Sequence, residues 1–208
     1  VCSALTSLDL SGWDVSKVED FGNMFQDCSS LTSIDVSGWD TKNAKSMNGV
    51  FSGCKNLQSI DVSGFNTLNV QNMTTMFYNC QKLEEIRGIG NWVTGELTDI
   101  AAIFANCSAL KSLDLGGFNV SKVTTTIYRE NNTNNTPYGL FRECNNLTRI
   151  DGLENWDTGN ITDMTNMFVK CENLVSVDVS NFNTSKVQAF TGMFTNCKKL
   201  EQIDVSRW

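Results

Sequence analysis

The stretch "MFQDCSSLTSIDVSGWD" at residues 24–40 returns twenty-six residues later as "VFSGCKNLQSIDVSGFN" at residues 50–66. Apolar, small and charged residues follow each other in nearly the same order in both stretches. A unit of this length cannot bury its apolar face alone, so it must stack on its neighbours. The repeat therefore predicts a solenoid, in which similar units stack along one axis.

The repeat extends over the whole chain. Successive cysteines are 26 or 27 residues apart, except for one gap of 37 residues. The cysteine column consists of Cys2, Cys28, Cys54, Cys80, Cys107, Cys144, Cys171 and Cys197. A leucine follows every cysteine by three residues, and a phenylalanine precedes each of the last seven by three. We therefore expect a single solenoid domain over residues 1–208, with about seven to eight repeats of 26 residues.

Two hydrophobic periods alternate within one unit. From Val18 to Leu31 the apolar residues are three or four positions apart, which predicts a short helix with one buried stripe. In "SIDVS" at residues 33–37 the period becomes two, which predicts a strand with one buried face. Each unit returns to the same phase, so successive strands should be parallel. The sequence therefore predicts an α/β repeat, with a parallel β-sheet on one face of the solenoid and short helices on the other.

The cysteines allow two interpretations. Eight cysteines in an exported protein can form four disulfides. However, residues in the same phase of adjacent coils lie about 5 Å apart with parallel Cβ vectors, whereas a disulfide requires Cβ atoms about 3.8 Å apart and facing each other. We therefore expect a column of buried free thiols, with disulfides as the alternative. A zinc site is disfavoured, because the chain has no histidine and no C-x-x-C pair.

Composition excludes several classes of function. The 23 acidic and 16 basic residues give a net charge of −7 without a basic cluster, so we expect no nucleic-acid partner. No apolar run approaches the roughly 20 residues that a membrane span requires, so we expect no membrane insertion in this segment. Without histidine, acid–base catalysis would depend on carboxylates, as in a glycosidase. Seven of the eight units offer the same carboxylate on an open face, so we expect no enzyme and no cofactor.

Those carboxylates form a second column. The aspartates seven residues after a cysteine are Asp9, Asp35, Asp61, Asp114, Asp151, Asp178 and Asp204. One interpretation is a structural ladder, in which neighbouring serine hydroxyls donate hydrogen bonds to the carboxylates. A second interpretation is a recognition surface. A third, calcium bridging, is weaker, because one carboxylate per coil falls short of the six to eight oxygens that calcium prefers.

The repeat also resembles a known family. The pattern in "MFVKCENLVSVDVSNFNT" at residues 167–184 is similar to the repeat of BspA-like bacterial surface leucine-rich-repeat proteins. This resemblance implies a right-handed leucine-rich-repeat-like solenoid on a secreted or wall-attached microbial protein that serves adhesion or host contact. It implies an extracellular, cell-surface location. Since the chain begins and ends within a repeat, we expect a monomeric fragment of a longer surface protein.

Two kinds of interruption suggest where a ligand binds. The units with "EEIRGIGNW" at residues 84–92 and "TRIDGLENW" at residues 148–156 are one residue longer, which we interpret as bulged turns, and each adds an arginine to the strand. A polar, asparagine-rich insertion at about residues 124–137 is typical of a solvated loop.

From these interruptions we predict a mixed-charge binding surface for a protein or glycan on another cell or matrix. Its residues are Asp61, Arg87, Asp114, Arg149 and Asp151. The alternative function is a structural spacer that projects another domain from the cell surface.

Overall fold

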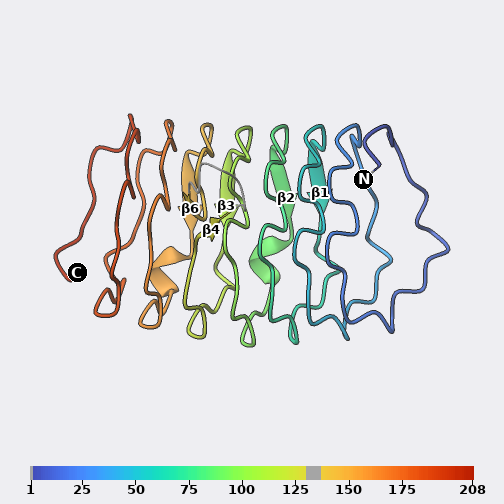
Figure 1. The fold of residues 1–208 in the computed structure, drawn as a ribbon, viewed down its shortest axis with the longest axis horizontal. Helices are drawn as coiled ribbons and strands as arrows, with labels where there is room; N and C mark the ends of the chain where they lie inside the picture. Colours follow the sequence, from blue (N-terminus) through green and yellow to red (C-terminus); the bar gives the residue numbers. More distant parts are fainter. Residues whose placement is uncertain (1, 130–136) are drawn as a thin grey trace.

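The computed structural model, which describes residues 2–129 and 137–208, is a stack of coils (Figure 1). The two ends of the chain lie at opposite ends of the stack. We number the coils from one cysteine of the column to the next. Coils 1 to 8 comprise residues 2–27, 28–53, 54–79, 80–106, 107–143, 144–170, 171–196 and 197–208. The predicted repeat solenoid is confirmed, while its right-handedness stays a prediction.

Four short strands line one side of the middle coils. They are β1 (Ser59–Asp61), β2 (Glu85–Arg87), β3 (Ser112–Asp114) and β6 (Arg149–Asp151). The pairs β1–β2 and β3–β6 are parallel, and the middle residue of each strand is buried, as the alternating pattern predicts. The expectation of one continuous sheet is wrong for the described residues, because these two pairs are separate sheets.

The longer units turn as predicted. In these two units the strand is followed by a 3-10 turn, η1 (Ile89–Asn91) after β2 and η2 (Leu153–Asn155) after β6. Gly88 and Gly152 begin these turns with φ of 81° and 94°, a left-handed conformation that favours glycine. A Cβ on Gly88 would collide with the backbone of Ser63 in the preceding coil. Each of these turns buries one apolar side chain, Ile89 in η1 and Leu153 in η2. The longer turn therefore adds a residue to the core.

The predicted helices are absent from the described residues, and a series of tight turns takes their place. In the turn segment at residues 20–28, Asn23 and Asp27 have positive φ, which an α-helix does not allow. The amide of Phe25 bonds to the carbonyl of Val50 in the next coil, at 2.9 Å, instead of to a residue four positions earlier. The equivalent turn segments are residues 46–54, 72–80, 99–107, 163–171 and 189–197, and the insertion interrupts the one in coil 5.

Two columns of stacked rings run through the core. Phenylalanines of successive turn segments, from Phe25 to Phe194, have ring centroids 5.2–6.1 Å apart. The tryptophans and phenylalanines that follow the strands, from Trp39 to Trp208, are 5.9–6.5 Å apart. Offset aromatic pairs at such distances add about 0.5–1.5 kcal/mol each beyond area burial. Each ring therefore stabilises the contact between its coil and the next.

The predicted free thiols are confirmed. All eight cysteines are free, and those from Cys28 to Cys171 are buried. The sulfur of Cys54 donates to the carbonyl of Phe25 in the preceding turn segment at 3.2 Å, and the five later cysteines repeat this contact at 3.0–3.1 Å. Burial raises the pKa of Cys54 to about 12.

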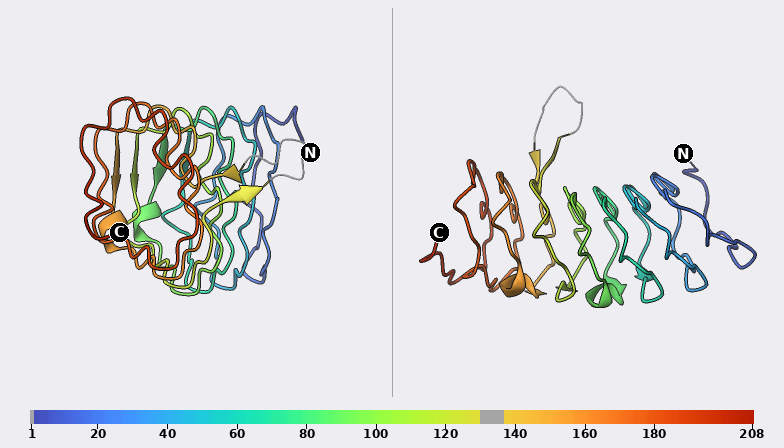
Figure 2. Two further views of the ribbon diagram at one scale, coloured as in Figure 1. Left: turned by 60° about the vertical axis from the view of Figure 1, so that its left-hand side comes forward. Right: turned by 90° about the horizontal axis from the view of Figure 1, so that it is seen from below.

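The insertion begins and ends as a hairpin instead of a simple loop. Antiparallel strands β4 (Tyr128–Arg129) and β5 (Pro137–Tyr138) project from coil 5 (Figure 2), and the predicted asparagine-rich tip lies outside the described residues. Tyr128 and Tyr138 contact the ring of Tyr78, two turn segments earlier, with centroids 6.3 and 5.3 Å apart. The intervening segment holds three buried alanines, at residues 101, 102 and 105. These small side chains leave space for the hairpin to cross.

Candidate interaction surface

The outward side chains of β1, β2, β3 and β6 form a surface that we call the strand face. It comprises Ser59, Asp61, Glu85, Arg87, Ser112, Asp114, Arg149 and Asp151. All five predicted binding residues are on this face. Strand register places Asp61 beside Arg87 and Asp114 beside Asp151. The structure therefore brings the predicted residues together in two groups, one on each two-stranded sheet.

Both arginines already have carboxylate partners within their own strands. Arg87 Nε donates to Glu85 Oε2 at 2.8 Å, and Arg149 contacts Asp151 Oδ2 through Nε and a terminal nitrogen, at 2.8 and 2.6 Å. These side chains are 42–70% exposed, and such ion pairs contribute only about 0–1 kcal/mol. These ion pairs therefore orient the arginine side chains at the surface but can be exchanged for contacts with a ligand at little cost.

The aspartate column is held by hydrogen bonds within each coil. Asp61 Oδ1 accepts a hydrogen bond from the backbone N–H of Ser63, two residues on, at 2.9 Å. Hydrogen bonds from the Ser63 hydroxyl and N–H, with a small contribution from nearby Arg87, lower the pKa of Asp61. The same local turn recurs at Asp9, Asp35, Asp114, Asp178 and Asp204. The predicted donation from serine hydroxyls is therefore borne out within a coil, as from Ser63 to Asp61 and from Ser180 to Asp178, instead of between neighbouring coils.

A shallow hollow lies beside β2 on the strand face. It has a volume of about 420 Å³ and lies between Ser59, Arg87 and Ser112. Lys111 at its edge pairs with Glu84 of the preceding coil at 2.5 Å. The hollow therefore presents donors and acceptors of both charges, which suits a polar ligand better than an apolar one.

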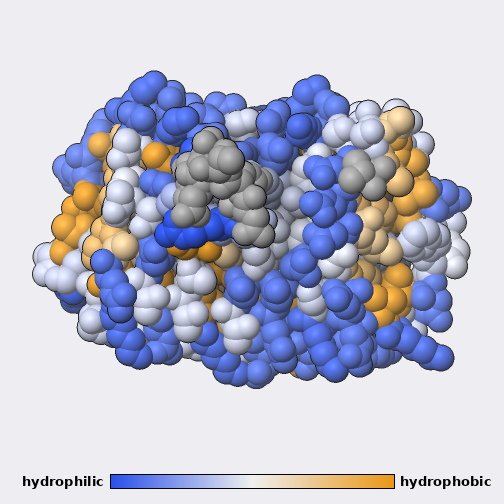
Figure 3. Space-filling model, viewed as in Figure 1, coloured by the Kyte–Doolittle hydropathy of each residue, from blue (hydrophilic) through white to orange (hydrophobic). Residues whose placement is uncertain are grey.

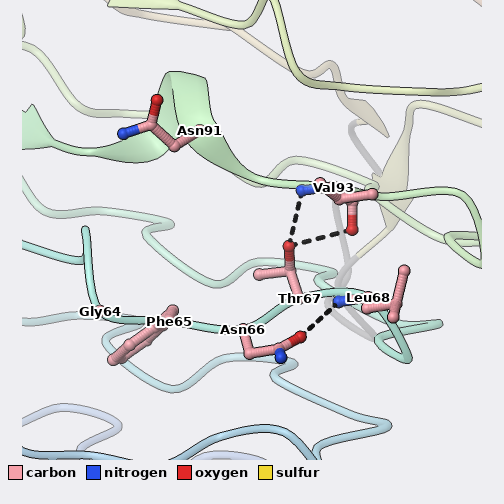
Figure 4. A pocket seen from close by; sticks show the side chains of 7 residues that line it. All are labelled: Gly64, Phe65, Asn66, Thr67, Leu68, Asn91 and Val93. Atoms are coloured by element: carbon pink, nitrogen blue, oxygen red, sulfur yellow. Dashed lines mark hydrogen bonds between the residues drawn. The ribbon is translucent and has the colours of Figure 1, made fainter.

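A second hollow, formed by the segments that follow β1 and β2, was not predicted from the sequence. It has a volume of about 380 Å³ and exposes Leu68 and Val93, at 54% and 56% (Figure 4). In neighbouring coils the position of Val93 holds an aspartate or asparagine, such as Asn66, whose side chain accepts the N–H two residues later. This substitution within the repeat was the signal that could have revealed the apolar surface.

A column of buried threonines also escaped the sequence analysis. The hydroxyl of Thr67 donates to the carbonyl of Val93 and accepts from its N–H, both at 3.0 Å (Figure 4). A threonine two residues after the aromatic ring makes such a bond in four coils, at Thr41, Thr67, Thr94 and Thr158. The recurring "DT" and "NT" pairs were the signal. The role of this column is to join coils, not to bind a ligand.

The face of the molecule in Figure 3 is mostly hydrophilic, with apolar side chains concentrated toward the two ends of the stack. In the described part of the chain, no helix is long and apolar enough to span a bilayer. Within residues 2–129 and 137–208, no three carboxylate or thiol side chains are grouped so that they could hold a metal ion.

Comparison with known proteins gives a family and two similar structures. A leucine-rich repeat protein from Bacteroides ovatus is 18% identical with a TM-score of 0.43, covering 97% of this chain and 55% of that one. A leucine-rich cell surface protein from Faecalibacterium prausnitzii is 14% identical with a TM-score of 0.36, covering 100% of this chain and 76% of that one. This chain thus spans about half the length of the Bacteroides protein. None of the curated proteins matches it.

The family match is more extensive. The family described as "Mycoplasma protein of unknown function, DUF285" matches residues 2–112, 46–136 and 135–208, which together cover nearly the whole chain. Its overlapping matches follow the repeat from the first cysteine to the last residue. The resemblance to BspA-like leucine-rich-repeat proteins is thereby confirmed, and the chain belongs to the DUF285 family.

Proposed function

We propose that this chain is a non-enzymatic interaction module on the outside of a microbial cell. Its strand face would bind a protein or glycan on another cell or matrix. The resemblance of the repeat to BspA-like surface proteins supports the extracellular location. Solenoids commonly bind partners through an extended surface of this kind, since many coils contribute to one contact area.

The observation that carries the proposal is the contrast between the two sides of the strands. The inward residues of β1, β2, β3 and β6 are all isoleucine or leucine, because each must pack on the next coil. The outward residues are serine and aspartate in β1 and β3, glutamate and arginine in β2, and arginine and aspartate in β6. Packing does not require this variety, whereas recognition of one particular ligand does.

The two arginines give the strand face its capacity for recognition. A guanidinium has five donors in a planar fork, and Arg87 and Arg149 use only part of this capacity in their exposed ion pairs. A carboxylate or sulfate of a ligand can therefore bind in two-pronged fashion without a large loss of existing contacts.

The experiment uses a ligand found by screening matrix proteins and glycans. The double change Arg87→Ala and Arg149→Ala should weaken its binding at least about tenfold, which corresponds to about 1.4 kcal/mol. The melting temperature should hardly change, because both ion pairs are exposed. The matched control is Lys45→Ala with Lys122→Ala, which removes the same charge from exposed ion pairs elsewhere on the stack. The control should bind like the unchanged protein.

Two outcomes would contradict this assignment. Arg87 takes the place of the aspartate in coil 4, beside Asp61. If the double arginine change lowers the melting temperature and leaves binding unchanged, Arg87 only relieves repulsion in the aspartate column. If binding survives that change but is lost when residues 129–136 are removed, the insertion carries the site.

A structural spacer is the second candidate. The observation that favours it is the sameness of the buried columns, which lets coils be added without changing the scaffold. The sequence of the whole gene product would distinguish the two, because a spacer requires another domain to project.

A further inference from the structure

Coil 1 departs from the regular stack where it meets coil 2. In the aromatic column, Trp39 stacks on Phe65 at 6.3 Å, and every later pair is similar. Among the described residues, no such ring contact joins Trp13 to Trp39, and Trp13 is 45% exposed. Figure 1 shows the dark-blue first coil diverging from the second. The two coils are therefore not closed against each other at the level of these rings.

A hollow opens between the two coils at this level. Its volume is about 320 Å³, near the lower end of the range of about 300–1,000 Å³ for small-molecule sites. Coil 1 contributes Asp9, Ser11 and Trp13, and coil 2 contributes Asp35 and Trp39. Its lining therefore combines an exposed indole with two carboxylates and hydroxyl groups.

The indole N–H of Trp39 is a buried donor without a partner. Trp39 is 4% exposed, and its Nε1 has no hydrogen bond among the described residues. In the same column, Trp92 and Trp208 donate to carbonyls of the preceding coil at 3.3 and 3.1 Å. The same orientation at Trp39 would direct its N–H toward coil 1, the side of the hollow, whereas Trp156 in the same column lacks a partner without lining this hollow. A ligand acceptor there would satisfy a donor whose burial otherwise costs stability.

The carboxylates of Asp9 and Asp35 supply hydrogen-bond acceptors for a ligand. Hydrogen bonds from the N–H and hydroxyl of Ser11 lower the pKa of Asp9, and the hydroxyl and N–H of Ser37 lower that of Asp35. Both groups are therefore ionised at neutral pH and accept hydrogen bonds only. An ionised carboxylate has about four lone-pair sites, so each retains room for a donor from a ligand.

A sugar hydroxyl both donates and accepts, and the apolar face of a pyranose ring can lie against an indole. An organic cation would suit the carboxylates and the ring but could not accept from Trp39 Nε1. We propose that the hollow between coils 1 and 2 binds a pyranose unit of a glycan, with Trp13 as the stacking surface, Trp39 Nε1 as donor, and Asp9 and Asp35 as acceptors. This site lies apart from Arg87 and Arg149 and does not depend on the strand face.

The test follows the indole N–H signals of the five tryptophans by nuclear magnetic resonance. Chitotetraose, cellotetraose and maltotetraose are titrated separately, and choline serves as the cationic probe. We expect at least one saccharide to shift the Trp13 and Trp39 signals with a Kd on the order of 1 mM. The Trp92 and Trp156 signals should stay in place.

Substitutions then identify the contacts. Trp39→Phe keeps a ring, as coil 3 does with Phe65, but removes the donor, and should weaken binding about 5- to 10-fold. Trp13→Ala, at a position that is 45% exposed, should abolish binding. Trp156→Phe is the matched control, because its Nε1 also lacks a partner but does not line this hollow, and it should leave affinity unchanged.

Three outcomes would overturn the proposal. The first is no saturable shift with any of the three saccharides. The second is binding that persists unchanged in both Trp13→Ala and Trp39→Phe. The third is a shift with choline and none with the saccharides. None of these results bears on the arginines of the strand face, so the two proposals fail separately.

Discussion

At the scale of single residues, cysteine serves here as a small apolar side chain with one weak donor. Cys80 is fully buried, and its sulfur donates to the carbonyl of Phe51 at 3.1 Å. Burial raises the pKa values of Cys54, Cys80 and Cys107. The thiolate is the reactive form, so these thiols should react slowly while the protein is folded.

The raised pKa values predict a loss of stability at alkaline pH. Below about pH 9 the thiols are protonated in both states, and their contribution to stability is complete. As pH rises from about 9 toward 12, thiols ionise in the unfolded chain but not in the folded one, so each lowers the free energy of unfolding by about 1.4 kcal/mol per pH unit. Urea denaturation at several pH values measures this slope.

The control is Cys80→Ala, which removes one titrating thiol and leaves lysines and tyrosines unchanged. Its slope above about pH 9 should be shallower than that of the unchanged protein by about 1.4 kcal/mol per pH unit. Equal slopes would show that Cys80 ionises alike in both states. Denatured protein should also show close to eight free thiols without reductant, since all eight are free in the structure.

At the scale of elements, the sequence predicted which residues are buried better than the backbone that buries them. Phe21, Phe25, Cys28 and Leu31 are buried as the helical spacing requires, but Met24 is 36% exposed. A series of tight turns can bury residues at the same spacing as a helix. Most residues one and five positions before the cysteines that have positive φ are glycine, asparagine or aspartate, and this was the signal against a helix, although Thr75, Ala102, Glu143 and Lys170 also adopt this conformation.

The link between two coils through a buried threonine is testable. In Thr67→Val the N–H and C=O of Val93 lose their partner, so the free energy of unfolding should fall by about 1–3 kcal/mol. The shape of valine suits this column, because Val120 occupies it in coil 5 and is fully buried. Denaturation by urea measures the loss. A change below about 0.5 kcal/mol would mean that water replaces the hydroxyl.

At the scale of the whole molecule, each coil contacts its neighbours, and stability should depend on position in the stack. Phe77 is fully buried between Phe51 and Phe104, with centroids 5.6 and 6.1 Å away. Phe77→Ala should therefore cost about 3–5 kcal/mol. Trp208→Ala should cost much less, because Trp208 is only partly buried and lies in the last coil. Thermal and urea denaturation compare the two, and equal losses would contradict a one-dimensional stack.

The repeat made the stack predictable, because residues at the same position of successive repeats had to occupy equivalent positions in successive coils. It also placed all five predicted binding residues on one face. It did not predict their partners, since a period of 26 residues says nothing about whether Arg87 reaches across to Asp61 or back to Glu85. The hollow between coils 1 and 2 was equally hidden, because Trp13 occupies the same column as Trp39 and differs only in its packing.

The turn segments have one further consequence, which is electrical. In all but the last of them, every second amide bonds to a carbonyl of the next turn segment, as in the bonds from Phe25 to Val50 and from Phe51 to Met76, so these amides point toward residue 208 and these carbonyls toward residue 2. Peptide dipoles of about 3.5 D thus add along this edge, as they do in a helix, although it contains no helix. The edge should carry partial positive charge toward coil 8 and partial negative charge toward coil 1. An anion approaching the stack along that edge would therefore be drawn to one end and repelled from the other.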